Sequence, residues 1–75
     1  AHYVQALNIA QALGTPLEEA RALEGIGHCR LQEGQASEGA AYLRQALALY
    51  RRLGSPDAQR VHTTLVNQGL QEPEE

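Results

Sequence analysis

The twelve residues from Gln5 to Pro16 recur forty positions later, from Gln45 to Pro56, and this internal repeat constrains the fold more than any other feature. The two segments read QALNIAQALGTP and QALALYRRLGSP, with six identical positions and conservative exchanges of Ile for Leu and Thr for Ser. Self-similarity at a fixed period of roughly 20–50 residues is typical of architectures that stack copies of one supersecondary unit. We therefore expect stacked repeat units, whose usual role is binding rather than catalysis.

Three breaks divide the chain into four segments with helical periodicity. Glycine ends each of the first three segments, and the Gly-Thr-Pro and Gly-Ser-Pro breaks continue with a hydroxyl residue and a proline, which open the next helix. Apolar residues recur every three or four positions within the segments. This pattern predicts helices over 1–13, 17–33, 37–53 and 57–69, with Thr15 and Glu18 forming a capping box. Short connections make neighbouring helices antiparallel, so we expect an all-α fold of about four helices in stacked hairpins.

The composition predicts a thin hydrophobic core. The 75 residues include no Phe, Trp or Met, so Leu, Ala, Ile, Val and three Tyr must fill the interior. A chain of this size buries only about 60% of its unfolded surface. The chain also opens at Ala1 inside a helical pattern. We expect it to belong to a longer protein, and the apolar face of its first helix to favour homodimerisation or end-to-end stacking.

Small and large apolar residues alternate along the second and third segments in a specific order. The order is Leu23-x2-Ile26-Gly27-x2-Arg30, followed by Gly39-x3-Leu43-x2-Ala46-Leu47. It resembles the tetratricopeptide repeat, a pair of antiparallel helices. The small residues would let the two helices approach closely while the large ones fill the space beside them. The positions that define the repeat by packing are Leu23, Ile26, Gly27, Gly39, Leu43, Ala46 and Leu47.

Two departures from that pattern point to a longer form of the repeat. Arg30 stands where the family usually has Tyr, and the second helix runs on to Gly54 without a closing proline, giving the forty-residue period. The stretch ALALYRRLGSPDAQRV is similar to the C-terminal repeats of Streptomyces antibiotic regulatory proteins and related ATPase-containing transcriptional activators. This resemblance implies one superhelical domain over 1–70 and a disordered acidic tail over 71–75. Within the domain, 1–13 would be the second helix of a truncated repeat, 17–53 one full repeat, and 57–69 a capping helix.

The resemblance also implies a binding surface. In tetratricopeptide arrays the first helix of each repeat lines a concave groove. The matching positions here are Arg21, Glu24, His28 and Gln32, with Arg60 and Asn67 on the last helix. The implied function is protein–protein interaction within a bacterial transcriptional regulator, with a protein or peptide as partner. The alternative is a purely structural repeat that self-associates or stacks on neighbouring repeats and has no ligand groove.

Charge and hydropathy disfavour nucleic-acid and membrane partners. The net charge is −3, and without the three glutamates of the QEPEE tail six Arg balance six acidic residues. A surface that binds nucleic acid directly needs a basic stripe, and we expect Arg44, Arg51 and Arg52 to form a solvated helix face instead. No apolar run of about 18 residues could cross a membrane. With a single cysteine and no signal peptide, we expect a cytoplasmic protein.

No motif for catalysis, a cofactor or a metal is present in the sequence. Gly25 and Gly27 lack the third glycine of a dinucleotide fingerprint, because Arg30 occupies its position. His28 and Cys29 are adjacent on a helix and therefore point about 100° apart, which disfavours a shared ion. We expect Cys29 to be a small buried residue. The chain is predicted to be no enzyme and to hold no cofactor or metal.

Overall fold

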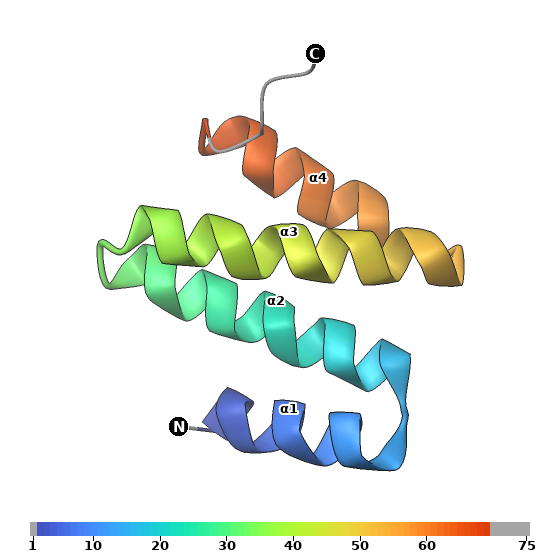
Figure 1. Cartoon of the computed structure of the whole chain (residues 1–75). Helices are drawn as coiled ribbons and strands as arrows, with labels where there is room; N and C mark the ends of the chain where they lie inside the picture. Colours follow the sequence, from blue (N-terminus) through green and yellow to red (C-terminus); the bar gives the residue numbers. More distant parts are fainter. Residues whose placement is uncertain (1, 70–75) are drawn as a thin grey trace.

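Four α-helices follow one another along residues 2–69, the part of the chain that the computed structural model describes (Figure 1). They are α1 (His2–Leu13), α2 (Pro16–Gln32), α3 (Ala36–Leu53) and α4 (Asp57–Asn67). No strand occurs within residues 2–69, so the all-α prediction is confirmed. Each helix begins and ends within two residues of the bounds expected from the glycine and proline breaks. The predicted acidic tail at 71–75 lies outside the described residues.

The two copies of the internal repeat end their helices in the same way. Gly14 and Gly54 adopt the left-handed conformation, with φ of 69° and 67°. The next amide then donates back to the last turn: Thr15 N to Ala10 O at 3.0 Å, and Ser55 N to Tyr50 O at 2.9 Å. This arrangement satisfies carbonyls that the helix end would otherwise leave free. The repeated letters Leu-Gly-Thr/Ser-Pro thus encode a repeated joint.

The hydroxyl residues after these glycines have different roles at the two joints. Thr15 Oγ1 donates to the Ala10 carbonyl at 3.3 Å, and no side chain caps α2, so the predicted Thr15–Glu18 capping box is wrong. The hydroxyl lies within reach of a carbonyl at the end of α1 and bonds to it instead. Ser55 Oγ, by contrast, accepts from the Asp57 amide at 3.2 Å.

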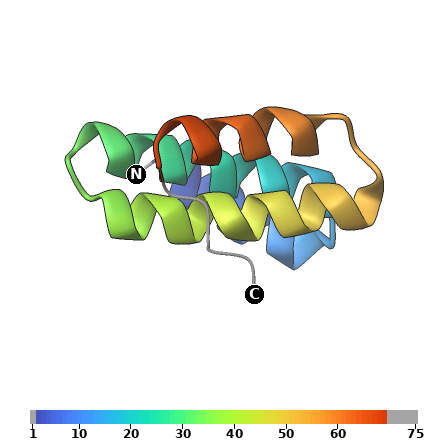
Figure 2. The ribbon, with the colours of Figure 1, turned by 90° about the horizontal axis from the view of Figure 1, so that it is seen from above.

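Helix α3 lies between α2 and α4 in the stack, and successive helices run antiparallel (Figure 1). Viewed from above, α2 and α4 lie toward one side of the molecule and α3 toward the other (Figure 2). The core is a single cluster of buried side chains from these three helices, against which Leu7 of α1 also packs. Its members are Ala20, Leu23, Ala40, Leu43, Ala46, Leu47, Tyr50, Val61 and Leu65.

Helices α2 and α3 are closest where Gly27 meets Gly39. A Cβ placed on Gly39 would lie 2.9 Å from the Gly27 carbonyl oxygen and 2.9 Å from Cγ of Leu31. A Cβ on Gly27 would lie 2.8 Å from Cγ of Leu43 and 3.0 Å from the Gly39 carbonyl oxygen. Real Cβ atoms essentially never come this near. The backbones touch because neither glycine has a side chain.

All seven positions that the repeat pattern singles out for packing are buried. They are Leu23, Ile26, Gly27, Gly39, Leu43, Ala46 and Leu47. The two glycines form the close contact, and the leucines fill the volume on either side of it. The polar residue at the aromatic position of the repeat, Arg30, is only half-buried and pairs with Glu33 and Glu38 at 3.1 and 3.3 Å. A charged side chain is accommodated there because it lies at the edge of the hairpin.

We predict that Gly39→Ala destabilises the protein, although alanine is the better helix former. The added methyl group meets a backbone carbonyl that cannot rotate away, and overpacking of this kind costs about 1–3 kcal/mol. This exceeds the gain of about 1 kcal/mol in helix propensity. Urea denaturation should show a net loss of up to about 2 kcal/mol in the free energy of unfolding.

Ala41 provides the matched control, because it is exposed on the same helix two residues away. There Ala41→Gly should cost about 1 kcal/mol through propensity alone. A Gly39→Ala variant more stable than the parent would contradict the close contact between α2 and α3.

Candidate functional site

A carboxylate shared by three helices is the most organised polar feature of the described residues. Glu24 of α2 accepts a hydrogen bond from the Tyr50 hydroxyl of α3 at 2.9 Å. It also accepts two from the Arg60 guanidinium of α4, at 2.7 Å from Nη2 and 3.1 Å from Nε. Only 12% of the Glu24 side chain is exposed. The carboxylate therefore bonds to two residues on other helices, which lie 26 and 36 positions after Glu24 in the chain.

Two further residues complete this group, which we call the Glu24 cluster: Glu24, His28, Tyr50, Asp57 and Arg60. His28 lies one turn after Glu24 on α2, with Nε2 3.5 Å from the carboxylate. Asp57 lies one turn before Arg60 on α4 and accepts a hydrogen bond from Nη1 of that arginine. Arg60 thus bridges two carboxylates, and its planar, forked donors suit that geometry.

The surroundings of Glu24 favour its charged form. Burial alone raises the pKa of this carboxyl, but hydrogen bonds from Arg60 and Tyr50 and the positive charge of Arg60 outweigh burial, so the pKa lies below its ordinary value. Burial, together with the hydrogen bond to Glu24, raises the pKa of Tyr50 to about 12. Tyr50 therefore remains a neutral donor at physiological pH.

The two charged residues of the Glu24 cluster on α4, Asp57 and Arg60, are also held in their charged forms. The hydrogen bond from Arg60 and a second one from Ser55 hold the pKa of Asp57 below its usual range. The hydrogen bond to Glu24 is the main reason that the pKa of Arg60 is raised. Glu24, Tyr50, Asp57 and Arg60 are thus a set of matched charges and donors that binds the helices together.

The structure brings together three of the six predicted groove residues: Glu24, His28 and Arg60. Sequence reasoning treated them as separate contacts for a partner, whereas Glu24 and Arg60 are hydrogen-bonded to each other. Arg21 is exposed and pairs with Glu18 at 3.4 Å. Gln32 and Asn67 are exposed as well. The exposed residues and the free side of His28 are the ones that could meet a ligand.

Sequence reasoning missed Tyr50 and Asp57. Tyr50 was assigned to the apolar face of its helix, and its side chain is indeed fully buried. A buried tyrosine hydroxyl nevertheless usually needs a hydrogen-bond partner, and that rule was the available signal. Asp57 gave a weaker signal. An acidic residue in the first turn of a helix interacts favourably with the helix dipole, so its presence there does not require a partner.

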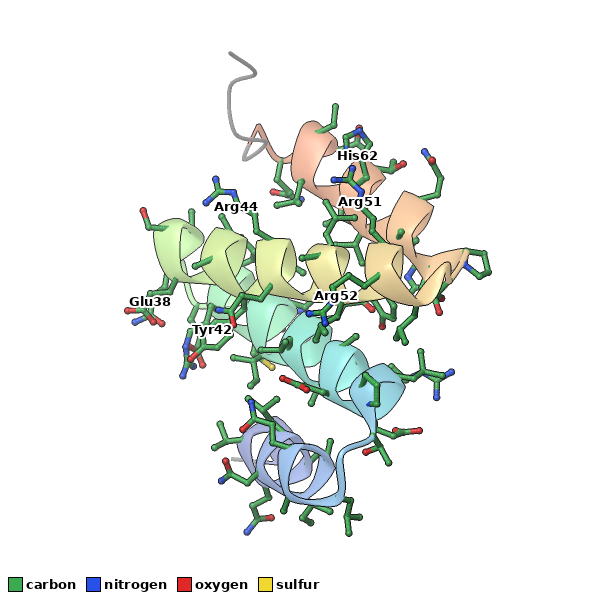
Figure 3. All side chains as sticks on the ribbon, turned by 45° about the vertical axis from the view of Figure 1, so that its right-hand side comes forward. Glu38, Tyr42, Arg44, Arg51, Arg52 and His62 are labelled. Carbon is green, nitrogen blue, oxygen red and sulfur yellow. The ribbon has the colours of Figure 1, made fainter. Side chains whose placement is uncertain are left out.

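The remaining chemical candidates do not form a second site. Within residues 2–69, no group of three or more His, Cys, Asp or Glu could hold a metal ion. Cys29 is half-buried rather than buried. Figure 3 shows Arg44 and Arg51 on the side of α3 nearer α4, whereas Arg52 projects from a different side. The three arginines therefore do not converge.

Comparison with known proteins adds no identification. A scan against family models and searches of curated proteins and of solved structures found no match to this chain. The tetratricopeptide resemblance accordingly stays a prediction from the residues quoted above. None of the helices in the described part of the chain is long and apolar enough to span a membrane.

We predict that Glu24→Gln lowers stability at neutral pH and that this loss shrinks in acid. Above the unfolded-state pKa near 4.5, Glu24 is charged in both states and its hydrogen bonds stabilise the fold fully. As pH falls below that value and through the lower folded-state pKa, the carboxylate is protonated and its contribution disappears. At pH 7 we expect a cost of about 1–2 kcal/mol, at the modest end because Arg60 is half-exposed.

The matched control for this variant is Glu18→Gln, which removes a carboxylate from an exposed pair on the same helix. Its effect should be within about 0.5 kcal/mol at any pH. Denaturant titrations between pH 3 and 7 would distinguish the two variants. Equal, pH-independent effects would contradict the assigned role of Glu24.

Proposed function

We propose that this chain is a helical repeat module that binds another protein or peptide, and that it serves a bacterial transcriptional regulator. The binding surface is the polar face formed by α2 and α4. Its exposed contacts are Arg21, Gln32, Asn67 and the accessible part of His28. Recognition uses shape and hydrogen bonds on a preformed surface and involves no covalent step.

The observation that carries this proposal is the ion pair between Glu24 and Arg60, at 2.7 Å. It fixes the spacing of α2 and α4, two helices that lie toward the same side of the molecule (Figure 2). A surface held in one geometry before binding loses less conformational entropy when a partner docks. Glu24 thus supports the binding face from beneath, and His28 is the member of the Glu24 cluster whose exposed edge contacts the partner.

Exposed charges around this support are available for recognition. The Arg21 and Glu18 side chains are 56% and 61% exposed, and such surface pairs contribute little to stability. They can be exchanged for contacts with a partner at small cost. His28 is 45% exposed while Nε2 lies near Glu24, so its other edge can meet a polar group.

The role in a transcriptional regulator rests on the similarity of the ALALYRRLGSPDAQRV stretch to C-terminal repeats of such proteins. The stacked hairpins and the contact of Gly27 with Gly39 are consistent with that type of repeat. A second candidate, a structural repeat that only stacks on neighbouring units, is favoured by the exposed Ile9 and Leu13 of α1.

A paired-variant capture experiment tests the binding face. A double variant with Arg21→Ala and Gln32→Ala should capture roughly tenfold less of a specific partner from a lysate of the source bacterium. Its free energy of unfolding should match that of the parent. The control, Gln45→Ala with Arg52→Ala, changes two equally exposed residues on α3 and should leave capture intact. Isotope-labelled mass spectrometry would quantify both variants. Identical capture by all three proteins would remove the binding face and favour the structural repeat.

The regulator assignment has a separate test in the gene that encodes these residues. We expect the same reading frame to contain a DNA-binding or nucleotide-binding domain. A reading frame that joins this segment to a metabolic enzyme domain, with neither a DNA-binding nor a nucleotide-binding domain, would contradict the assignment and leave the binding proposal standing.

A further inference from the structure

An apolar hollow of about 400 Å³ lies where α1 meets α2, away from the Glu24 cluster. Ala10 and Ala22 are its buried floor, at 3% exposure each, and Ile9 and Leu13 stand at its rim with 60% and 71% of their surface exposed. Leucine and isoleucine side chains gain free energy when they are buried away from water. Because two such side chains lie beside one hollow, covering them with another apolar surface is strongly favourable.

The internal repeat identifies the counterpart of this hollow within the same molecule. Residues of α1 that line it recur forty positions later in α3, and each is more buried there. Ala6 is exposed, whereas Ala46 is fully buried. Ile9 is exposed, whereas Leu49 packs against the core. Leu13 is 71% exposed and Leu53 43%.

Helix α2 is the element that covers the counterpart surface. Ala20 and Leu23 of α2 belong to the same buried cluster as Ala46 and Tyr50 of α3, and Glu24 bonds to Tyr50 directly. Helix α4 flanks this surface after the Gly-Ser-Pro joint, just as α2 flanks the hollow after the Gly-Thr-Pro joint. The α1–α2 pair therefore repeats the α3–α4 pair, but among residues 2–69 no helix lies across α1 as α2 lies across α3.

We infer that the α1–α2 hollow binds an amphipathic α-helix of another polypeptide segment, which lies on α1 as α2 lies on α3. Its apolar face follows the spacing of Ala20 and Leu23, so a small residue permits close approach and a large one enters the hollow. Ala10 occupies the position of Tyr50, which leaves room for that large side chain. The rim is nearly neutral, because its two charged residues, Glu18 and Arg21 of α2, pair with each other.

This surface shares Arg21 with the polar face of α2 and α4 proposed above for partner recognition, but the side chains on which it depends, Ile9 and Leu13, belong to α1 and lie outside that face. The inference rests on the difference in burial between the two copies of the repeat, and the test below leaves Gln32, Asn67 and His28 of the protein unchanged. Failure of one proposal would not decide the other.

A stabilised peptide with the sequence of residues 16–33 is the direct probe, because α2 is the helix that fills the counterpart surface. A hydrocarbon staple between positions 18 and 22 lies opposite Ala20, Leu23 and Gly27 at 100° per residue. It secures helicity, which circular dichroism would verify, and Cys29→Ser prevents oxidation of the peptide. Fluorescence anisotropy would measure its binding to the 75-residue protein.

We expect saturable binding that the Ile9→Glu, Leu13→Glu double variant weakens by about tenfold or more, since the helix covers Ile9 and part of Leu13. These residues are exposed, so the double variant should keep the parent circular dichroism spectrum. Leu53→Glu, the counterpart of Leu13→Glu in the second copy, should bind the peptide as the parent does. A peptide with Leu23→Glu should lose binding.

Three results would overturn the inference. One is no binding of the helical peptide at millimolar protein; another is binding that the Ile9→Glu, Leu13→Glu variant leaves unchanged. The third is concentration-dependent dimerisation in sedimentation that the same variant abolishes while the peptide fails to bind. That outcome would assign the hollow to a second copy of this chain.

Discussion

The contact between Gly27 and Gly39 is the constraint on which the rest of the structure depends. It brings the backbones of α2 and α3 together, so that Leu43 on one helix and Leu23 on the other can share one core. A chain without Phe, Trp or Met has few large side chains with which to fill a wider gap. Close approach of the backbones is thus how a core of Leu and Ala becomes well packed.

The position of α4 follows from this hairpin. Because α2 lies close against α3, Glu24 comes within 2.9 Å of the Tyr50 hydroxyl and can also reach Arg60. The Glu24 cluster orients the last helix, whose own buried contribution includes only Val61 and Leu65. Polar contacts and packing together fix the face on which we place partner binding. The same hairpin geometry, one repeat earlier, leaves α1 without a covering helix in the part of the chain that the structure describes.

The sequence predicted what depends on local spacing and missed what depends on register between helices. Gly14 and Gly54 could be assigned because a glycine before Thr/Ser-Pro marks a helix end, and Gly27 because a glycine inside an apolar helix needs a packing reason. The role of the Thr15 hydroxyl could not be assigned, since it could either accept from the Glu18 amide in a capping box or donate to the Ala10 carbonyl, as it does. The union of Glu24, Tyr50 and Arg60 joins residues up to 36 positions apart, and no spacing rule covers that distance.

Nuclear Overhauser spectroscopy of the 75-residue protein tests the central claim most directly, because it reports the separation of α2 and α3 in solution. With the Gly27 carbonyl oxygen 2.9 Å from where a Gly39 Cβ would lie, the Hα protons of the two glycines should show a strong cross-peak. Contacts from these protons to the Leu43 and Leu31 methyl groups should accompany it. A folded, helical protein that lacks the Gly27–Gly39 cross-peak would contradict the packing of the hairpin, and with it the covering role of α2 from which the α1–α2 hollow is interpreted.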